Sequence, residues 1–424
     1  MLRSTPSTIE SRPQTGVDAV PARVSGALIA LLAVCCALSV ANVYYAQPLL
    51  DMLADDFGIA RATIGGVIGA TQLGCAAALL LVVPLGDLFD RRRLIAVQLV
   101  LLTAALLLVA AAHSRTQLLL GMAALGVLGT AMTQGLLACA ASMAAPHEQG
   151  RVVGGAQGGV VMGLLLGRVL SGTIAELFSW RAVYLLSAGA SVAMLLALWP
   201  ALAGRRRPLV RLSYLQLLRS LFTLVLHERV LQVRGMLALL LFAAFGIFWS
   251  ALVLPLSAPP HALSHTAIGA FGLVGAAGAL AAARAGRLAD RGLGQTTTGF
   301  ALALLLLAWW PLSHGMQAWW ALIVGIVLLD MGGQAVHVVN QNMALAIDPA
   351  ASSRLVAGYM LFYAAGSGAG ALAATTVYAL AGWSGVCLLG ATVSLAALLL
   401  WAATLRWIPT VVMPRAHHRR CANA

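Results

Sequence analysis

Polar side chains recur at helical spacing within an apolar segment near residue 335. The steps between them are four, three and four residues, so they share one face of a helix. At 1.5 Å per residue this polar stripe is roughly 16 Å long. Against lipid it would be costly, so we expect it to face the protein interior or water. The stripe consists of Asp330, Gln334, His337 and Gln341.

Two members of the stripe can exchange protons. Burial favours the neutral form of a carboxyl group such as that of Asp330, and a histidine such as His337 titrates near neutral pH. Ionisable residues inside a membrane are functional-site candidates by default. Either residue could therefore carry a coupling proton. The alternative is a structural role, in which both groups are permanently hydrogen bonded to neighbouring helices.

Arg168 is the other charged residue in the middle of an apolar segment. As a cation it could bind an anionic substrate, or a carboxylate of the protein such as Asp330 or Glu176. A structural ion pair between two parts of the protein is the alternative. The sequence leaves open whether Arg168 and Asp330 interact.

The elements that must position these residues follow from composition. The chain has 424 residues, of which 61% are hydrophobic and 9% are charged, far fewer charges than a soluble domain carries. Its apolar runs are long enough to cross a bilayer as helices, and they lack the alternating polarity of a membrane barrel. We therefore predict an all-α membrane protein of twelve transmembrane helices. They are expected at 24–46, 62–85, 94–112, 117–141, 152–176, 181–203, 235–256, 266–284, 297–313, 317–345, 355–380 and 384–407.

Arginine placement predicts the topology. All but four of the 26 basic residues fall in the tails, in the middle of the chain or in loops after even-numbered spans. Under the positive-inside rule both termini are then cytoplasmic. The predicted division is a disordered cytoplasmic tail (1–23), a six-helix half (24–203), a basic cytoplasmic linker (204–234), a second six-helix half (235–407) and a basic cytoplasmic tail (408–424). The histidines expected in outside loops, where water would solvate them, are His261, His265 and His314.

The two halves repeat each other. At an offset of 203 residues Arg151 aligns with Arg354, and Trp180 aligns with Trp383. At an offset of 200 the loop G-D-L-F-D-R, residues 86–91, aligns with G-R-L-A-D-R, residues 286–291. Two parallel six-helix repeats with a binding site at their interface describe one large transporter architecture.

The loop motifs and a glycine pattern resemble those of the major facilitator superfamily. The runs P-L-G-D-L-F-D-R-R-R and A-G-R-L-A-D-R-G resemble its glycine–aspartate–arginine loop. In the fifth span Arg168 replaces the proline of its antiporter motif and Ser171 replaces the first glycine of the final pair, while the matching glycines are Gly154, Gly163, Gly167 and Gly172. The run N-V-Y-Y-A-Q-P-L-L at 42–50 is similar to bacterial efflux-type permeases.

This resemblance implies the major facilitator fold, with halves that rock about a central site. It also implies that the loop motif latches one conformation. The latch candidates are Gly86, Asp90, Arg91, Gly286, Asp290 and Arg291. Further residues are candidates to line the central cavity, with packing or interhelical hydrogen bonding as the alternative role for each. These are Asn42, Tyr44, Tyr45, Gln72, Gln134, Trp249, Tyr359 and Tyr363.

The predicted function is secondary active transport of a small solute by alternating access, in the form of proton-coupled efflux. An uptake symporter or an uncoupled facilitator is the alternative within transport. Without lysine the chain has no Walker A loop, so the energy must come from an ion gradient or from the solute's own gradient, unless a partner supplies it. A membrane-embedded enzyme or a transporter-like sensor is disfavoured, because we find no catalytic motif or output domain. We expect no cofactor, metal site, nucleic-acid partner or obligate protein partner, and a location in the bacterial inner membrane.

Overall fold

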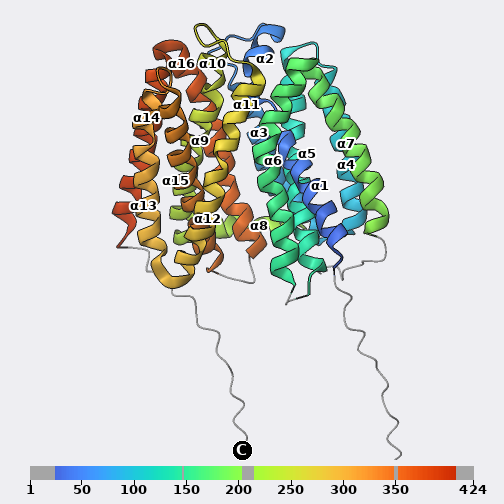
Figure 1. The fold of residues 1–424 in the computed structure, drawn as a ribbon. Coiled ribbons are helices and arrows are strands. Elements are labelled where there is room, and N and C mark those ends of the chain that lie inside the picture. Colours follow the sequence, from blue (N-terminus) through green and yellow to red (C-terminus); the bar gives the residue numbers. More distant parts are fainter. Residues whose placement is uncertain (1–23, 146–147, 203–213, 348–351, 407–424) are drawn as a thin grey trace, which may run out of the picture.

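The computed structural model describes residues 24–145, 148–202, 214–347 and 352–406. These residues form helices packed into two bundles that stand side by side (Figure 1). The described chain ends lie on one side of the bundles, here called the termini side, and the opposite side is called the far side (Figure 1). The predicted tails and the first part of the predicted linker lie outside the described residues.

The first bundle is built from the helices before residue 202. Helix α1 packs along α6, α3 along α5, and α4 along α7. The elements are α1 (Gly26–Tyr44), η1 (Gln47–Leu49), α2 (Leu50–Phe57), α3 (Gly66–Ala77), η2 (Ala78–Val82), η3 (Val83–Asp87), α4 (Arg91–Ala110), α5 (Arg115–Met143), α6 (Gln149–Leu177) and α7 (Trp180–Ala201).

The second bundle is built from the helices after residue 213, and its most extensive packing joins α9 to α16. The elements are α8 (Tyr214–His227), α9 (Arg229–Ala251), α10 (Val253–Ser257), α11 (His265–Val274), α12 (Ala276–Leu288), η4 (Ala289–Leu293), α13 (Gly294–Leu307), α14 (Trp309–Ser313), α15 (Trp319–Leu345) and α16 (Ser352–Thr404).

The predicted number of transmembrane helices is confirmed. Eleven stretches of the described residues are long and apolar enough to span a membrane. The last of them contains a break at Gly382, whose φ of 62° and ψ of −160° are not helical, so it comprises two helices, 352–381 and 383–404. A positive φ favours glycine because it has no Cβ atom. The turn at this residue therefore produces the twelfth span.

Serine hydroxyls mark where several spans begin. Ser25, Ser114, Ser179 and Ser264 each accept a hydrogen bond from the backbone N–H three residues on. Such N-caps satisfy a donor that the first helical turn leaves free. The spans thus start within a few residues of the predicted positions, except that α9 begins at Arg229, ahead of the expected 235.

The two bundles meet mainly on the far side. Helix α6 packs closely on α11, α3 packs on α16, and the short helices α2 and α10 touch each other. Glycines allow this approach, because a Cβ atom on Gly172 would collide with the backbone of His265. Toward the termini side, a Cβ atom on Gly154 or Gly158 of α6 would meet no neighbouring element among the described residues within 4 Å. The contact between the halves is therefore tight on the far side and loose toward the termini side.

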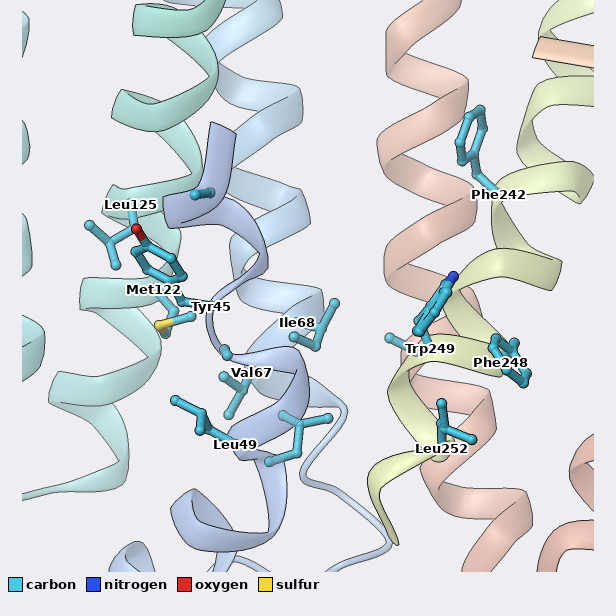
Figure 2. Packing of buried hydrophobic residues seen from close by; sticks show 14 of the residues in the cluster. Tyr45, Leu49, Val67, Ile68, Met122, Leu125, Phe242, Phe248, Trp249 and Leu252 are labelled. Carbon is cyan, nitrogen blue, oxygen red and sulfur yellow. The ribbon is translucent and has the colours of Figure 1, made fainter. Parts of the chain in front are cut away.

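Buried side chains fill both bundles (Figure 2). On one side of this view Tyr45 lies against Met122 and Leu125, and on the other Trp249 and Phe248 extend from α9. The rings of Phe248 and Trp249 meet edge to face with centroids 5.0 Å apart. Phe248 also meets the rings of Trp309 on α14 and Trp383 on α16 edge to face, and these contacts fix α9, the helix that carries Trp249.

Candidate functional site

The predicted polar stripe lies on α15, in the second bundle. Asp330 is only 6% exposed, and the other three members are half-buried. The Oδ2 atom of Asp330 is buried and has no hydrogen-bond partner in the described part of the chain. An unpaired buried carboxylate oxygen is costly. This atom therefore requires a proton or a donor from a bound molecule.

His337 is held within the second bundle. Its Nδ1 atom lies 3.0 Å from the hydroxyl oxygen of Tyr359, which is itself fully buried on α16. The edge of the imidazole meets the ring of Phe242 with centroids 5.1 Å apart. The contact between His337 and Tyr359 thus joins two helices, as the structural alternative for His337 requires.

Arg168 lies on α6 and is 6% exposed. Its Nε donates a hydrogen bond of 2.8 Å to Gln47 Oε1. The guanidinium carbon lies 4.2 Å from the ring centroid of Trp249 and 5.3 Å from that of Tyr44. Aromatic faces attract cations and stack on the flat guanidinium. Residues of both bundles therefore fix the orientation of this cation.

Arg168 and Asp330 approach the same short stretch of α11 and α12. A Cβ atom on Gly272 would lie 3.3 Å from Arg168 Cδ, and one on Gly275 would lie 2.8 Å from Asp330 Oδ2. The two charges interact electrostatically but form no salt bridge with each other. Glu176, the other predicted partner of Arg168, instead accepts a hydrogen bond of 2.6 Å from Thr266 Oγ1.

Two further pairs join the bundles at the level of this site. The hydroxyl groups of Tyr44 and Tyr363 hydrogen bond to each other. Gln72 Nε2 donates to Ser367 Oγ at 3.0 Å. The first bundle thus contributes Arg168, Tyr44 and Gln72 to a common interface, and the second contributes Asp330, Trp249 and Tyr363.

Other cavity candidates lie elsewhere. Asn42 is 1% exposed and is bonded within the first bundle to Leu38 O and Ser187 Oγ. Tyr45 packs in the apolar core of that bundle (Figure 2). Gln134 is half-buried on α5. The contacts of Asn42 and Tyr45 are of the kind that their alternative role, packing or interhelical hydrogen bonding, requires.

The loop motif combines a helix cap with contacts between helices. Asp90 is the N-cap of α4 and accepts from Arg93 N at 3.0 Å, so it caps its own helix. Arg91 donates to Ala138 O on α5. Among the described residues no neighbouring element lies within 4 Å of a Cβ position on Gly86, so close packing to them does not explain that glycine. In the second copy a Cβ atom added to Gly286 would make only ordinary contact with Val338. Arg291 is exposed, and the side chain of Asp290 is not among those described.

The far side carries an ion pair that the sequence did not suggest. Asp51 of α2 and His265 of α11 approach with His265 Nε2 at 2.9 and 3.0 Å from the two carboxylate oxygens. The expectation that water would solvate His265 is therefore wrong. Because Asp51 belongs to the first bundle and His265 to the second, the pair joins the halves where they pack most tightly.

A second buried arginine was also missed. Arg234 on α9 is 1% exposed, and its Nη1 donates to Asn340 Oδ1 at 3.1 Å. Its Nε and the Asn340 Nδ2 have no partner among the described groups. Arg234 falls in the predicted linker, 204–234, because the seventh span was expected to begin at residue 235.

Twelve spans in two packed halves, with charges buried between them, fit the architecture of a membrane transporter. The chain matches the Major Facilitator Superfamily over residues 29–309, and it belongs to that family. It is a multi-pass transporter and not an enzyme.

A relative supports this assignment, and a solved structure shares the fold. The transporter YgaY of Escherichia coli strain K12 is 42% identical over 378 residues, which cover 89% of this chain and 95% of that one. The purine ribonucleoside efflux pump NepI of Escherichia coli O127:H6 is 30% identical over 199 residues, 45% of this chain and 48% of NepI. A bacterial homolog of the human lysosomal transporter Spinster, in an inward-facing and occupied conformation, superposes with a TM-score of 0.68 at 12% identity, covering 90% of this chain and 97% of that one.

Proposed function

We propose that the protein exports a small solute in exchange for protons, with Asp330 as the residue that carries the proton. The observation that carries this proposal is the buried Oδ2 atom of Asp330, which lacks a partner. Asp330 is an intramembrane carboxyl at the interface between the halves, opposite Arg168 of the other bundle. Such a group can take up a proton in one conformation and release it in the other.

The direction of transport rests on similarity. NepI is described as an efflux pump, and it matches part of this chain. In the proposed cycle the far side faces outward and both termini are cytoplasmic, as the arginine distribution predicts. The tight packing of α6 on α11 then corresponds to a conformation that is closed to the outside. The halves rock as units, 24–203 against 235–407, and the 86–91 and 286–291 loops latch one end state.

Proton movement in proteoliposomes tests the proposal. Purified protein is reconstituted with an internal pH dye, and a panel of nucleosides, amino acids, sugars and drugs is added to wild type and to Asp330→Asn. We expect at least one solute to change the internal pH with wild type and not with the variant. The matched control is Asp56→Asn, because Asp56 pairs with Arg181 inside one bundle.

Each outcome has a definite meaning. A pH response that persists in Asp330→Asn would exclude Asp330 as the proton carrier and direct attention to His337. Solute movement without any pH response in wild type would refute proton coupling and favour the uncoupled facilitator. A loss of response in Asp56→Asn as well would show that the assay reports general damage to the fold.

A further inference from the structure

The cation of Arg168 has unused hydrogen-bonding capacity. An arginine side chain carries five N–H donors, and the structure records one hydrogen bond, from Nε to Gln47 Oε1. The two aromatic rings hold the plane of the guanidinium in place. The remaining Nη donors form a fork that suits a carboxylate or a phosphate. No carboxylate of the described residues forms a salt bridge with it.

The carboxyl group of Asp330 has an unused hydrogen-bond acceptor, whereas Arg168 has unused donors. Its Oδ2 atom is buried and accepts no hydrogen bond from the described residues. The residue is 6% exposed, as Arg168 is. Arg168 Cδ lies 3.3 Å from the Cβ position of Gly272, and Asp330 Oδ2 lies 2.8 Å from that of Gly275. These two glycines are three residues apart, which is about one helical turn. A donor-rich cation and an acceptor without a partner thus lie close together, one from each half.

A single solute can satisfy both groups if it carries both kinds of charge. A solute that is only anionic would bind Arg168 but would be repelled by the negative charge of Asp330. A solute that is only cationic would meet the positive charge of Arg168. Like charges repel strongly where water is excluded. The site as a whole is electrically balanced, and it therefore favours a solute that is balanced as well.

We infer that the transported solute is amphoteric, with an anionic group that binds Arg168 and an ammonium or other N–H donor group that binds Asp330. This inference rests on the proposed function, because the ammonium group and the transported proton then compete for the same carboxylate. A solute held in this way also bridges the two bundles. It would release Asp330 only when a proton replaces its ammonium group, which links solute exit to proton entry.

Matched small molecules test the charge preference. The probes are phenylalanine, phenylalaninamide, N-acetylphenylalanine and N-acetylphenylalaninamide, together with the same four derivatives of alanine. Within each set the scaffold is constant while the anionic and cationic groups are removed in turn. Binding to the full-length protein in lipid nanodiscs is followed by the thermal unfolding temperature at increasing probe concentration.

We expect a free amino acid to bind at least about tenfold more tightly than the singly charged and neutral derivatives of its set. Arg168→Gln should abolish this preference for an anionic group. Asp330→Asn should leave the N-acetyl derivative binding as well as the free amino acid. Arg181→Gln is the matched control, because Arg181 pairs with Asp56 at the far side of one bundle, and it should preserve the wild-type order.

The inference is overturned if no probe of either set binds, if the singly charged derivatives bind as well as the amino acids, or if Arg168→Gln keeps the wild-type order. Should Arg168→Gln fail to fold, Arg168→Lys keeps the charge but lacks the fork, and a weaker anion preference is expected. These binding measurements need no proton gradient. Proton-coupled movement of another solute without the amphoteric preference would overturn this inference alone, whereas the preference without proton movement would overturn the coupling alone.

Discussion

Substitution of Asp51 by asparagine should open the far side of the transporter. The Asp51–His265 pair joins α2 to α11, so it exists only while the two halves meet on that side. Both side chains are largely buried, with exposures of 11% for Asp51 and 18% for His265. Exposed pairs contribute up to about 1 kcal/mol, and breaking a fully buried pair costs about 3–5 kcal/mol. An intermediate value of about 2 kcal/mol is reasonable for this environment.

That free energy translates directly into a population. Since about 1.4 kcal/mol corresponds to a factor of ten, the ratio of open to closed far side should rise roughly 30-fold. Pulsed electron paramagnetic resonance can measure this ratio with spin labels at Thr116→Cys and Gln317→Cys in a cysteine-free background. Both positions are exposed on the far side, one on each half. The distance between the two spin labels should be longer when the far side is open than when it is closed. The population with the longer distance should therefore rise in Asp51→Asn.

The control for this experiment lies in the same short helix. Asp56 forms a 2.8 Å salt bridge with Arg181, and both residues belong to the first bundle. Asp56→Asn removes a charge of the same kind without touching the contact between the halves, so the distance distribution should stay as in wild type. An unchanged distribution in Asp51→Asn, or equal shifts in both variants, would refute the reasoning that this pair closes the far side.

Two further predictions concern glycine and capping positions. Gly275→Ala should reduce transport severalfold without unfolding the protein, because the new Cβ would lie 2.8 Å from Asp330 Oδ2; Gly154→Ala, with no neighbour within 4 Å, should transport normally in the same flux assay. Asp90→Ala should destabilise the protein by about 1 kcal/mol, measured by thermal unfolding, because the cap of α4 on Arg93 N is lost. An unchanged unfolding temperature would contradict the capping role.

Much of the fold could be predicted because the membrane restricts the choices. An apolar run of about 20 residues in lipid must be a helix, so hydropathy alone located the twelve spans. The short helix α2 and the helix α8 were not predicted. Both helices are amphipathic but shorter than a membrane span. Helix α8 is also held against the first bundle by a hydrogen bond from the Tyr214 hydroxyl to Leu81 O, which no local sequence pattern reveals.

The site could be predicted only in part, for a similar reason. The burial of Asp330 and Arg168 could be predicted because both lie within long apolar segments, whatever the arrangement of the helices. Their partners did not follow, because these lie far away along the chain. Arg168 is fixed by Gln47 and Trp249. The Asp51–His265 pair joins residues that are 214 positions apart, and it depends on how the halves meet.

If Asp330 carries a coupling proton, a proton gradient alone should drive the solute across the membrane, and a flux assay with an imposed gradient can measure this. Proteoliposomes with an imposed gradient of one pH unit, and with the membrane potential clamped at zero, are given equal solute on both sides. If one proton exchanges for one solute, the solute should accumulate on the more acidic side, up to about tenfold at equilibrium. An internal-to-external solute ratio that stays at one, in vesicles that do exchange labelled solute, would contradict the account.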